Sequence, residues 1–413
     1  MSAAPHSVRR RLALYLSGFD PQGPAHYHQL YSTEAARQAQ ASGHTLEVGR
    51  RRKASEHIAW WEVQGRTDGA TEPVSTRYEF LRWDDVVRDY WPRGRWALFQ
   101  RTLFATQAMW GNGVMWRAMK TSWPMFVAIA LPGAMIVLLG LLLLGLLTAA
   151  LGLASADHVG GAVALVALGL PALAWFGTVA ERRTNMAWLM RSLACLAEQG
   201  RGQTPDLEAR LDHFADHVAA QLRAGTWDEV LLIGHSSGAM MAMIVAARAL
   251  QRLEAEGGAT APPLSLLTLG HCSPLLSYQP EADTFRAELR TLHRAQGTAL
   301  HWVDYGAPPD GCCFPLVDPT APAWVGVPPH ERTGAPPKML NPRFAQHFTP
   351  ATYQAVRQDK FRCHFQYLMA TECPGDYDYF ALTAGPLTLA QRHADRPSVT
   401  DFRQFQRLGG PGL

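Results

Sequence analysis

The segment VLLIGHSSGAM, residues 230–240, contains the residues best suited to chemistry. Gly234 and Gly238 lie two residues before and two residues after Ser236, between an apolar, strand-like run and a helix-forming run. Glycines at these positions permit a sharp turn in which larger side chains would collide with the strand and the helix. The spacing predicts a strained turn that holds Ser236 exposed above a sheet as a nucleophile. An ordinary strand-to-helix loop is the alternative.

The segments around this turn alternate in type. Apolar runs at 229–234, 264–270 and 299–305 predict buried strands, and the stretches 204–225, 238–256 and 281–296 predict helices. Further strands are predicted near the N-terminus, at 11–19, 44–51, 57–64 and 76–83. Apolar strands that alternate with helices indicate a mostly parallel sheet covered on both faces. The predicted fold class is therefore α/β.

With LIGHSSGAM at 232–240 and this order of elements, the chain resembles the α/β-hydrolase superfamily, and its lipase- and esterase-like serine hydrolases in particular. The resemblance spans most of residues 8–83 and 184–395. It implies an α/β-hydrolase fold with the intervening segment as an insertion. It also implies a catalytic triad in the chain order nucleophile, acid, histidine.

The acid that the resemblance implies lies after the strand predicted at 299–305. Asp310, in APPDG and 74 residues after Ser236, resembles the acid of lipase-like members. Asp304, inside the strand, and Asp318, further along the loop, are alternatives. A catalytic acid must reach a ring nitrogen of the histidine and stabilise the imidazolium that forms.

Four histidines follow this acid loop. His364 lies 54 residues past Asp310, in DKFRCHFQYLMA, where aromatic neighbours could shelter a neutral base. We therefore predict His364 as the base. His347 is the main alternative, followed by His393, and His330 is the remaining candidate.

An oxyanion hole needs two backbone N–H groups directed at the developing negative oxygen. The resemblance implies one donor from Ser237 and one from a loop after an early strand. Residues 15–31, YLSGFDPQGPAHYHQLY, are expected to form that loop, with Phe19 after Gly18 as the second donor. In the implied mechanism Ser236 attacks an acyl carbonyl and water deacylates the enzyme, with no metal or organic cofactor.

Two apolar segments interrupt the α/β pattern. Residues 121–156 and 158–180 contain no formally charged side chain, and roughly 20 apolar residues cross a bilayer. They predict a transmembrane helical hairpin over 124–180 that turns at SADHVGG. The run MIVLLGLLLLGLLTAALGLA has no polar face, which disfavours the alternative of a helix pair buried in a soluble core.

Basic residues flank this hairpin on both sides, whereas its turn offers only Asp157 and His158. By the positive-inside rule the catalytic domain is expected to face the cytoplasm, and the alanine- and arginine-rich composition favours a bacterial cytoplasmic (inner) membrane. Several tryptophans suit an interfacial belt, so residues 84–123 are expected to lie along the bilayer surface. Aromatic packing in a soluble cap is the alternative. These tryptophans are Trp91, Trp96, Trp110, Trp116, Trp123, Trp175 and Trp188.

The charge pattern and the cysteines exclude other classes of protein. A net charge of +3 forms no phosphate track, so no nucleic-acid partner is expected. The clusters Arg9–Arg11 and Arg50–Arg52 are interpreted as solvated strand edges. The six cysteines lack a CxxC pair and zinc-site spacing and are interpreted as reduced thiols.

Together these features predict a membrane-anchored serine hydrolase that cleaves acyl esters of lipophilic substrates, as a lipase, phospholipase or esterase does. A thioesterase or acyltransferase with the same triad, and a non-catalytic membrane scaffold with a hydrolase fold, are the alternatives. Residues 1–83 and 181–395 are assigned to the hydrolase domain and 396–413 to a tail. The sequence leaves the oligomeric state open.

Overall fold

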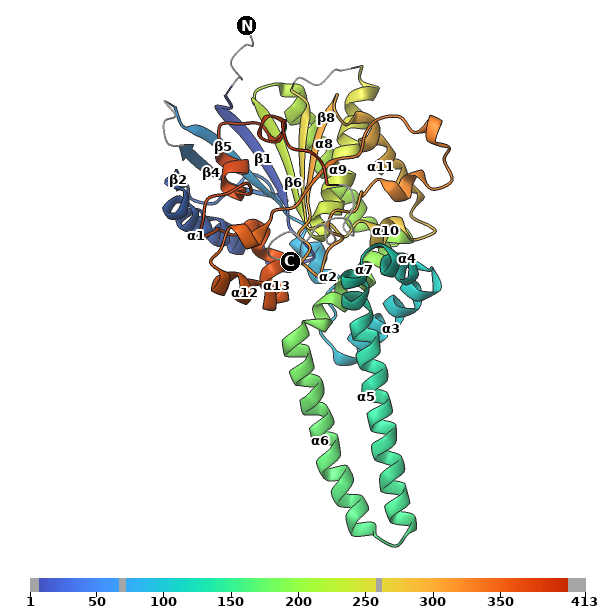
Figure 1. Ribbon diagram of the computed structural model, residues 1–413. Coiled ribbons are helices and arrows are strands. Elements are labelled where there is room, and N and C mark those ends of the chain that lie inside the picture. Colours follow the sequence, from blue (N-terminus) through green and yellow to red (C-terminus); the bar gives the residue numbers. More distant parts are fainter. Residues whose placement is uncertain (1–6, 67–71, 258–261, 400–413) are drawn as a thin grey trace. The chain divides into compact units, whose positions relative to one another are not determined.

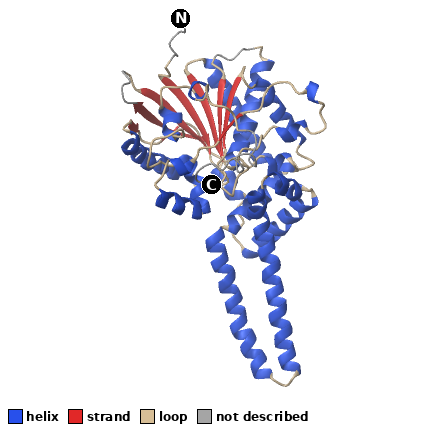
Figure 2. Cartoon of the chain, in the orientation of Figure 1, coloured by secondary structure: helices blue, strands red, loops and turns tan. Residues whose placement is uncertain are grey.

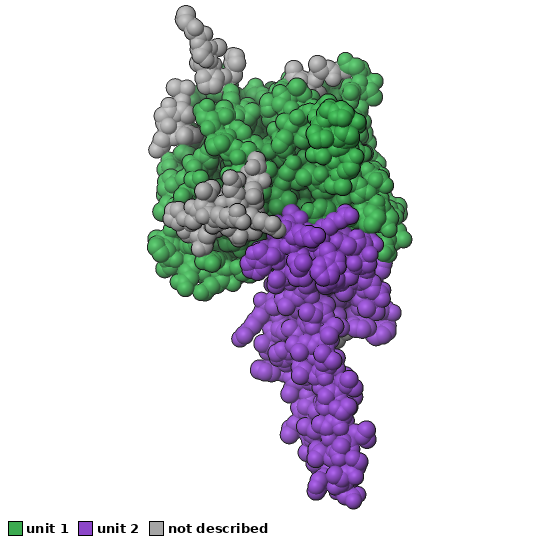
Figure 3. All heavy atoms as spheres, turned by 45° about the vertical axis from the view of Figure 1, so that its right-hand side comes forward, with its two compact units in different colours: residues 1–89, 199–413 green, residues 90–198 purple. Residues whose placement is uncertain are grey.

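The computed structural model describes residues 7–66, 72–257 and 262–399 (Figure 1). The chain forms two compact units, residues 1–89 with 199–413 and residues 90–198 (Figure 3). These boundaries differ from the predicted breaks at 83/84 and 180/181. The helix after the apolar hairpin packs within the second unit, where Arg191 donates to the Pro92 carbonyl oxygen and lies over the Trp91 ring.

In the described part of the first unit, nine strands form one mixed sheet (Figure 2). The strand order is β2-β4-β5-β1-β6-β7-β8-β9, with β3 paired to β4. Strands β5, β1, β6, β7, β8 and β9 are parallel, whereas β4 runs antiparallel to β5, and both β2 and β3 run antiparallel to β4. The strands are β1 (Arg10–Leu16), β2 (Thr45–Val48), β3 (Arg52–Lys53), β4 (Ile58–Arg66), β5 (Val74–Leu81), β6 (Glu229–His235), β7 (Leu264–Leu269), β8 (Leu300–Tyr305) and β9 (Lys338–Leu340).

The apolar runs form the strands at the centre of this sheet. Every residue of β6 and β7 is buried, which matches their continuous apolar sequence. The predicted α/β class, with a mostly parallel sheet flanked by helices, is confirmed. The three-residue strand β9 was not predicted, because it is too short to give a pattern.

The helices of the first unit include α8, whose predicted apolar face is buried. One expectation is wrong: residues 15–31 are not a continuous loop, because α1 begins at Pro24, a residue that favours the first turn of a helix. The helices are α1 (Pro24–Ser42), α2 (Asp84–Asp89), α8 (Pro205–Ala224), α9 (Ser237–Ala255), α10 (Pro274–Ser277), α11 (Asp283–Ala295), α12 (Pro350–Gln358), α13 (Lys360–Phe365), α14 (Tyr379–Ala384) and α15 (Leu389–Arg392), with short 3₁₀ turns at Ala321–Trp324, Pro329–Glu331, Phe344–Gln346 and Gln366–Leu368.

The second unit is helical. Its α5 (Trp123–Ser155) and α6 (Val159–Thr184) are long and apolar enough to span a membrane, and only 11% and 6% of their most apolar windows are buried. A helix pair in a soluble core would be mostly buried. The other helices are α3 (Arg95–Gly111), α4 (Val114–Thr121) and α7 (Met186–Gly200).

Arg11 departs from the expected solvated strand edge. Arg9 and Arg10 are exposed, whereas Arg11 is fully buried. Its Nε donates to Glu229 Oε2 at 2.6 Å, and its other nitrogens donate to the carbonyl oxygens of Gly385 and Leu387. The pair therefore joins β1, β6 and a C-terminal segment. Most of the predicted tail, residues 400–413, lies outside the described residues.

Candidate active site

Ser236 occupies the turn between β6 and α9. Its backbone has φ 58° and ψ −125°, a sparsely populated conformation for a residue other than glycine. A Cβ at Gly234 would collide with the Gly238 carbonyl, and one at Gly238 would collide with the carbonyl oxygens of Leu16 and Ser17. The Ser236 amide donates to the Leu269 carbonyl oxygen at 2.9 Å. The two glycines thus permit the strained turn, and β7 holds it.

The Ser236 side chain is not exposed as expected, since Ser236 retains only 5% of its accessible surface. The loop after β1 lies against it, and a Cβ at Gly18 would lie 3.1 Å from Ser236 Cβ and 3.5 Å from its Oγ. Burial of this kind strengthens electrostatic interactions at the hydroxyl because water is largely removed.

Asp310 and His364 meet beside this turn. Asp310 lies in the loop after β8, whereas His364 lies on α13, which follows β9 and α12 in the chain. His364 Nδ1 lies 2.9 Å from Asp310 Oδ2, and both side chains are buried. The structure therefore places the predicted acid and the predicted base in hydrogen-bond contact.

Three donors surround the Asp310 carboxylate. The Cys312 amide donates to Oδ1 at 2.9 Å, and Oδ2 accepts from the Tyr367 hydroxyl at 3.2 Å as well as from His364. Burial alone raises the pKa of Asp310, but the His364 ring and the hydrogen bonds from His364, Cys312 and Cys313 lower this pKa overall. The ionised carboxylate only accepts hydrogen bonds, so Nδ1 of neutral His364 carries the proton and Nε2 is its basic nitrogen.

His235 links this pair to the nucleophile turn. Its Nε2 donates to the His364 carbonyl oxygen at 2.8 Å, and the two rings lie 4.8 Å apart, centroid to centroid. Burial and the neighbouring His364 lower the pKa of His235 to about 3, so its ring is neutral at physiological pH. Because Ser236 is the next residue in the chain, His235 fixes the His364 segment beside the serine.

The alternative bases lie in other networks. His347 Nε2 bonds to the Pro342 carbonyl oxygen, and its ring packs beside Gly375. His393 Nε2 lies 3.3 Å from the Tyr305 hydroxyl, and His330 is exposed beside Glu331.

The alternative acids also lie elsewhere. Asp304 accepts from the Thr268 hydroxyl at 2.6 Å, and Asp318 accepts from the amide and hydroxyl of Thr320. The structure brings Asp310 and His364 together, whereas it places Asp304 and Asp318 in these separate contacts.

The two predicted oxyanion donors are Ser237, which directly follows Ser236, and Phe19, which directly follows Gly18 beside Ser236. Ser237 is the first residue of α9, and the first N–H groups of a helix have no partner within that helix. Phe19 directly follows Gly18, and its ring packs edge-on against Trp83, which donates to the Ser17 carbonyl oxygen. The oxyanion roles of both amides stay predictions.

Two residues of this site escaped the sequence analysis. Tyr367 contacts the acid, and a signal was present, since it lies three residues after His364 and so on the same side of a helical turn. His235 was seen only as part of the glycine-rich turn. Its contact joins segments 129 residues apart, which no local pattern can show.

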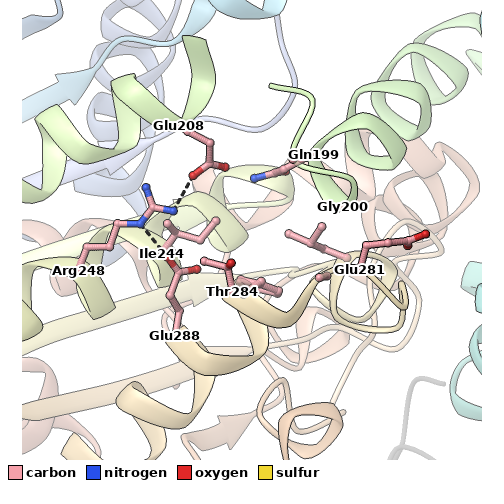
Figure 4. Close-up of a pocket in the computed structure, with 12 residues that line it drawn as sticks. Gln199, Gly200, Glu208, Ile244, Arg248, Glu281, Thr284 and Glu288 are labelled. Carbon is pink, nitrogen blue, oxygen red and sulfur yellow. Dashed lines mark hydrogen bonds and ion pairs between the residues drawn. The ribbon is translucent and has the colours of Figure 1, made fainter. Parts of the chain in front are cut away.

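A pocket of about 220 Å³ lies elsewhere in the first unit, between α8, α9 and α11 (Figure 4). Arg248 on its wall pairs with Glu208 at 2.5 Å and with Glu288 at 2.7 Å. Ser236, Asp310 and His364 do not line this pocket. Among the described residues, no group of three or more His, Cys, Asp or Glu side chains is placed to hold a metal ion.

No protein-family model matches the chain, and no curated protein or solved structure matches it either. The resemblance to the α/β-hydrolase superfamily therefore stays a proposal. Its support is the geometry of Ser236, Asp310 and His364.

Proposed function

We propose that this chain is a serine hydrolase of the α/β-hydrolase type that cleaves acyl esters of lipophilic substrates. One observation carries the proposal: a buried carboxylate is bonded to a histidine, and the backbone carbonyl of that histidine is bonded to His235, the residue directly before a serine held at φ 58° on a strand-to-helix turn. A residue in such a strained conformation needs support from its surroundings, and strain of this kind clusters at functional sites.

The sheet supports the fold assignment. The nucleophile follows β6 near the middle of the sheet, the acid follows β8, and the base follows β9, in the chain order serine, acid, histidine. The amides of Ser236, Gly270 and Gly306 donate to carbonyl oxygens at the ends of β7, β8 and β9. These bonds continue the ladder beyond the strands and align the loops that carry the triad.

The chemistry follows from this arrangement. His364 Nε2 accepts the Ser236 proton as Oγ forms a bond to the acyl carbon, and the Ser237 and Phe19 amides stabilise the oxyanion. The C–O bond to the leaving alcohol then breaks, and the alcohol takes the proton from His364. A water molecule repeats these steps on the acyl-enzyme, which releases the acid and restores Ser236.

A catalytic unit that is anchored in a membrane would meet lipophilic esters that partition into the bilayer, which supports a lipophilic substrate. We place α5 and α6 across a bacterial cytoplasmic membrane with the catalytic unit in the cytoplasm, because basic residues flank both ends of the pair and the turn has none. A cysteine introduced at Asp157 should react with an impermeant thiol reagent added outside intact cells. If this cysteine is protected and the exposed Cys373 reacts, the opposite orientation holds, with the catalytic unit outside the cell.

A fluorophosphonate probe tests the enzyme assignment. We expect covalent labelling of the wild type, its loss in Ser236→Ala and its retention in Ser32→Ala, whose hydroxyl bonds within α1 to the His28 carbonyl. A folded wild type that resists labelling would instead identify a non-catalytic scaffold. An esterase should release fatty acid faster from long-chain oxygen esters than from the matching thioesters, and a thioesterase should show the reverse. Transfer of the acyl group to an added alcohol identifies an acyltransferase.

A further inference from the structure

Helix α3 of the second unit presents apolar side chains outward. Trp96 is 68% exposed, Leu103 48% and Trp110 40%, and Phe99 lies between them at the surface. With 100° per residue, these four positions share one side of the helix, and the exposed Gln100 and Gln107 form its edge. We call Trp96, Phe99, Leu103 and Trp110 the α3 stripe. Large exposed apolar surfaces of this kind mark contact sites.

The α3 stripe continues toward the hairpin. The Trp110 ring packs edge-on against Trp116 of α4 at 5.6 Å and against Phe126 of α5 at 6.3 Å. Next along α5, Trp123 and Val127 are themselves exposed. The exposed apolar surface thus runs from α3 to the first turns of α5.

Helix packing fixes the level of Thr106 of α3 along the hairpin. Gly161, Gly169 and Gly177 of α6 face Leu153, Leu146 and Leu139 of α5, which sets an antiparallel register. Continued to the end of α6, this register brings Arg182 and Arg183 level with residues 132–134 of α5. Thr106 of α3 lies against Gly133, at that same level.

The length of the hairpin beyond this level matches a membrane. From Gly133 to Ser155 there are 22 residue steps (155 − 133), or roughly 33 Å of helix. The hydrocarbon core of a bilayer is about 30 Å thick. If α5 and α6 span, Thr106 of α3 therefore lies where the hydrocarbon core meets the headgroups, and Trp110, which packs against Phe126, lies further from the hairpin turn.

The excess of basic residues in the second unit favours a lipid with an anionic headgroup. Residues 90–198 contain eight Lys and Arg but only three Asp and Glu, and Asp157 lies at the far turn. The basic residues are Arg93, Arg95, Arg101, Arg117, Lys120, Arg182, Arg183 and Arg191. Basic residues beside a bilayer are attracted to anionic headgroups, and tryptophan favours the same depth.

We propose that α3 docks against an anionic lipid surface, with Phe99 and Leu103 of the α3 stripe toward the acyl chains and Gln100 toward water. This inference rests on the proposed span of α5 and α6. The docked helix gives the second unit a membrane contact besides the hairpin, independent of the triad.

Site-directed spin labels on the full chain in lipid nanodiscs test the proposal. Four variants each carry one introduced cysteine, at Phe99, Gln100, Leu144 or Arg51, in a Cys312→Ser and Cys373→Ser background whose remaining native cysteines are buried. Phe99 and Gln100 are adjacent but point about 100° apart, Leu144 lies mid-hairpin, and Arg51 is an exposed reference in the first unit. Collision rates with oxygen and with a water-soluble nickel complex report depth.

We expect Leu144 to be deepest, Phe99 oxygen-accessible and shielded from nickel, and both Gln100 and Arg51 nickel-accessible. Replacing half of the phosphatidylcholine by phosphatidylglycerol should shift the Phe99 oxygen-to-nickel ratio further, by at least about twofold. If the label at Phe99 is as nickel-accessible as the label at Arg51 while the label at Leu144 is deep, the docking is overturned but the span stands. If the label at Leu144 is also nickel-accessible, both are overturned. If phosphatidylglycerol has no effect on the ratio, the preference for an anionic surface is overturned. Fluorophosphonate labelling of each variant tests the proposed serine hydrolase activity separately.

Discussion

The Tyr367 hydroxyl donates to Asp310 Oδ2 at 3.2 Å, and that same oxygen accepts from His364 Nδ1 at 2.9 Å. The hydroxyl itself accepts from the Ala307 amide at 2.8 Å, which directs its proton toward the carboxylate. Tyr367 is fully buried, and its ring fills the space beside Gly270. Tyr367 is thus a positioning residue, which acts on the base through the acid.

Tyr367→Phe removes this donor and keeps the ring. We expect kcat/KM to fall about three- to tenfold, the effect of one net hydrogen bond. With one donor fewer, the Asp310 carboxylate is less well fixed against His364 Nδ1, so the loss should fall on kcat rather than on KM. Tyr31→Phe, which removes a buried hydroxyl bonded to Thr383 Oγ1, is the control and should leave kcat unchanged.

The choice of base is tested by two matched histidine variants. His364→Gln should abolish fluorophosphonate labelling and lower kcat by about 10³-fold or more, because Ser236 loses its proton acceptor. His347→Gln should label like the wild type, since His347 bonds to the Pro342 carbonyl away from Asp310. The reverse pattern, measured as initial labelling rates, would assign the base to His347.

The nucleophile turn depends on Gly238. In Gly238→Ala the new Cβ would overlap the carbonyl oxygens of Leu16 and Ser17, which belong to the end of β1 and the loop after it. We expect a loss of several kcal/mol of stability, as is typical of overpacking against rigid backbone, together with loss of labelling. Gly111→Ala, where a Cβ meets no atom within 4 Å, is the control for thermal unfolding. Equal midpoints for the two variants would contradict this account of the turn.

Acid should destabilise the fold partly through His235. Its pKa is about 3 when folded and about 6.5 when unfolded. Between these values the unfolded chain binds more protons, so stability falls as pH falls. From pH 7 to pH 5 this group costs about 2 kcal/mol. Urea titrations in detergent, followed by near-ultraviolet circular dichroism, should show a loss smaller by that amount in His235→Gln, whereas the exposed His330→Gln should behave as wild type.

The buried Arg11–Glu229 pair makes a further prediction. Glu229 also accepts from the Ser265 hydroxyl and the Leu389 amide, so Arg11→Met leaves an uncompensated carboxylate inside the sheet. We expect a loss of about 3–5 kcal/mol. The double variant Arg11→Met with Glu229→Gln should recover part of it in the same urea titrations. A single variant as stable as the wild type would show that the pair contributes nothing.

Local sequence determined the elements and the turn. The apolar runs of β6 and β7, the amphipathic pattern of α8 and the glycines around Ser236 each encode a conformation through contacts within a few residues, so they could be predicted. The two apolar helices were likewise evident, because length and composition suffice to define them.

Tertiary structure decided which distant residues meet. Four histidines fitted the chain order equally by type, and only folding brought His364 to Asp310 and left His347 and His393 in other contacts. It likewise buried Arg11 and Ser236 and placed Tyr367 and His235 beside the pair. Those outcomes depend on which strands become neighbours in the sheet, and strand order is set by the packing of the whole chain, which no local pattern contains.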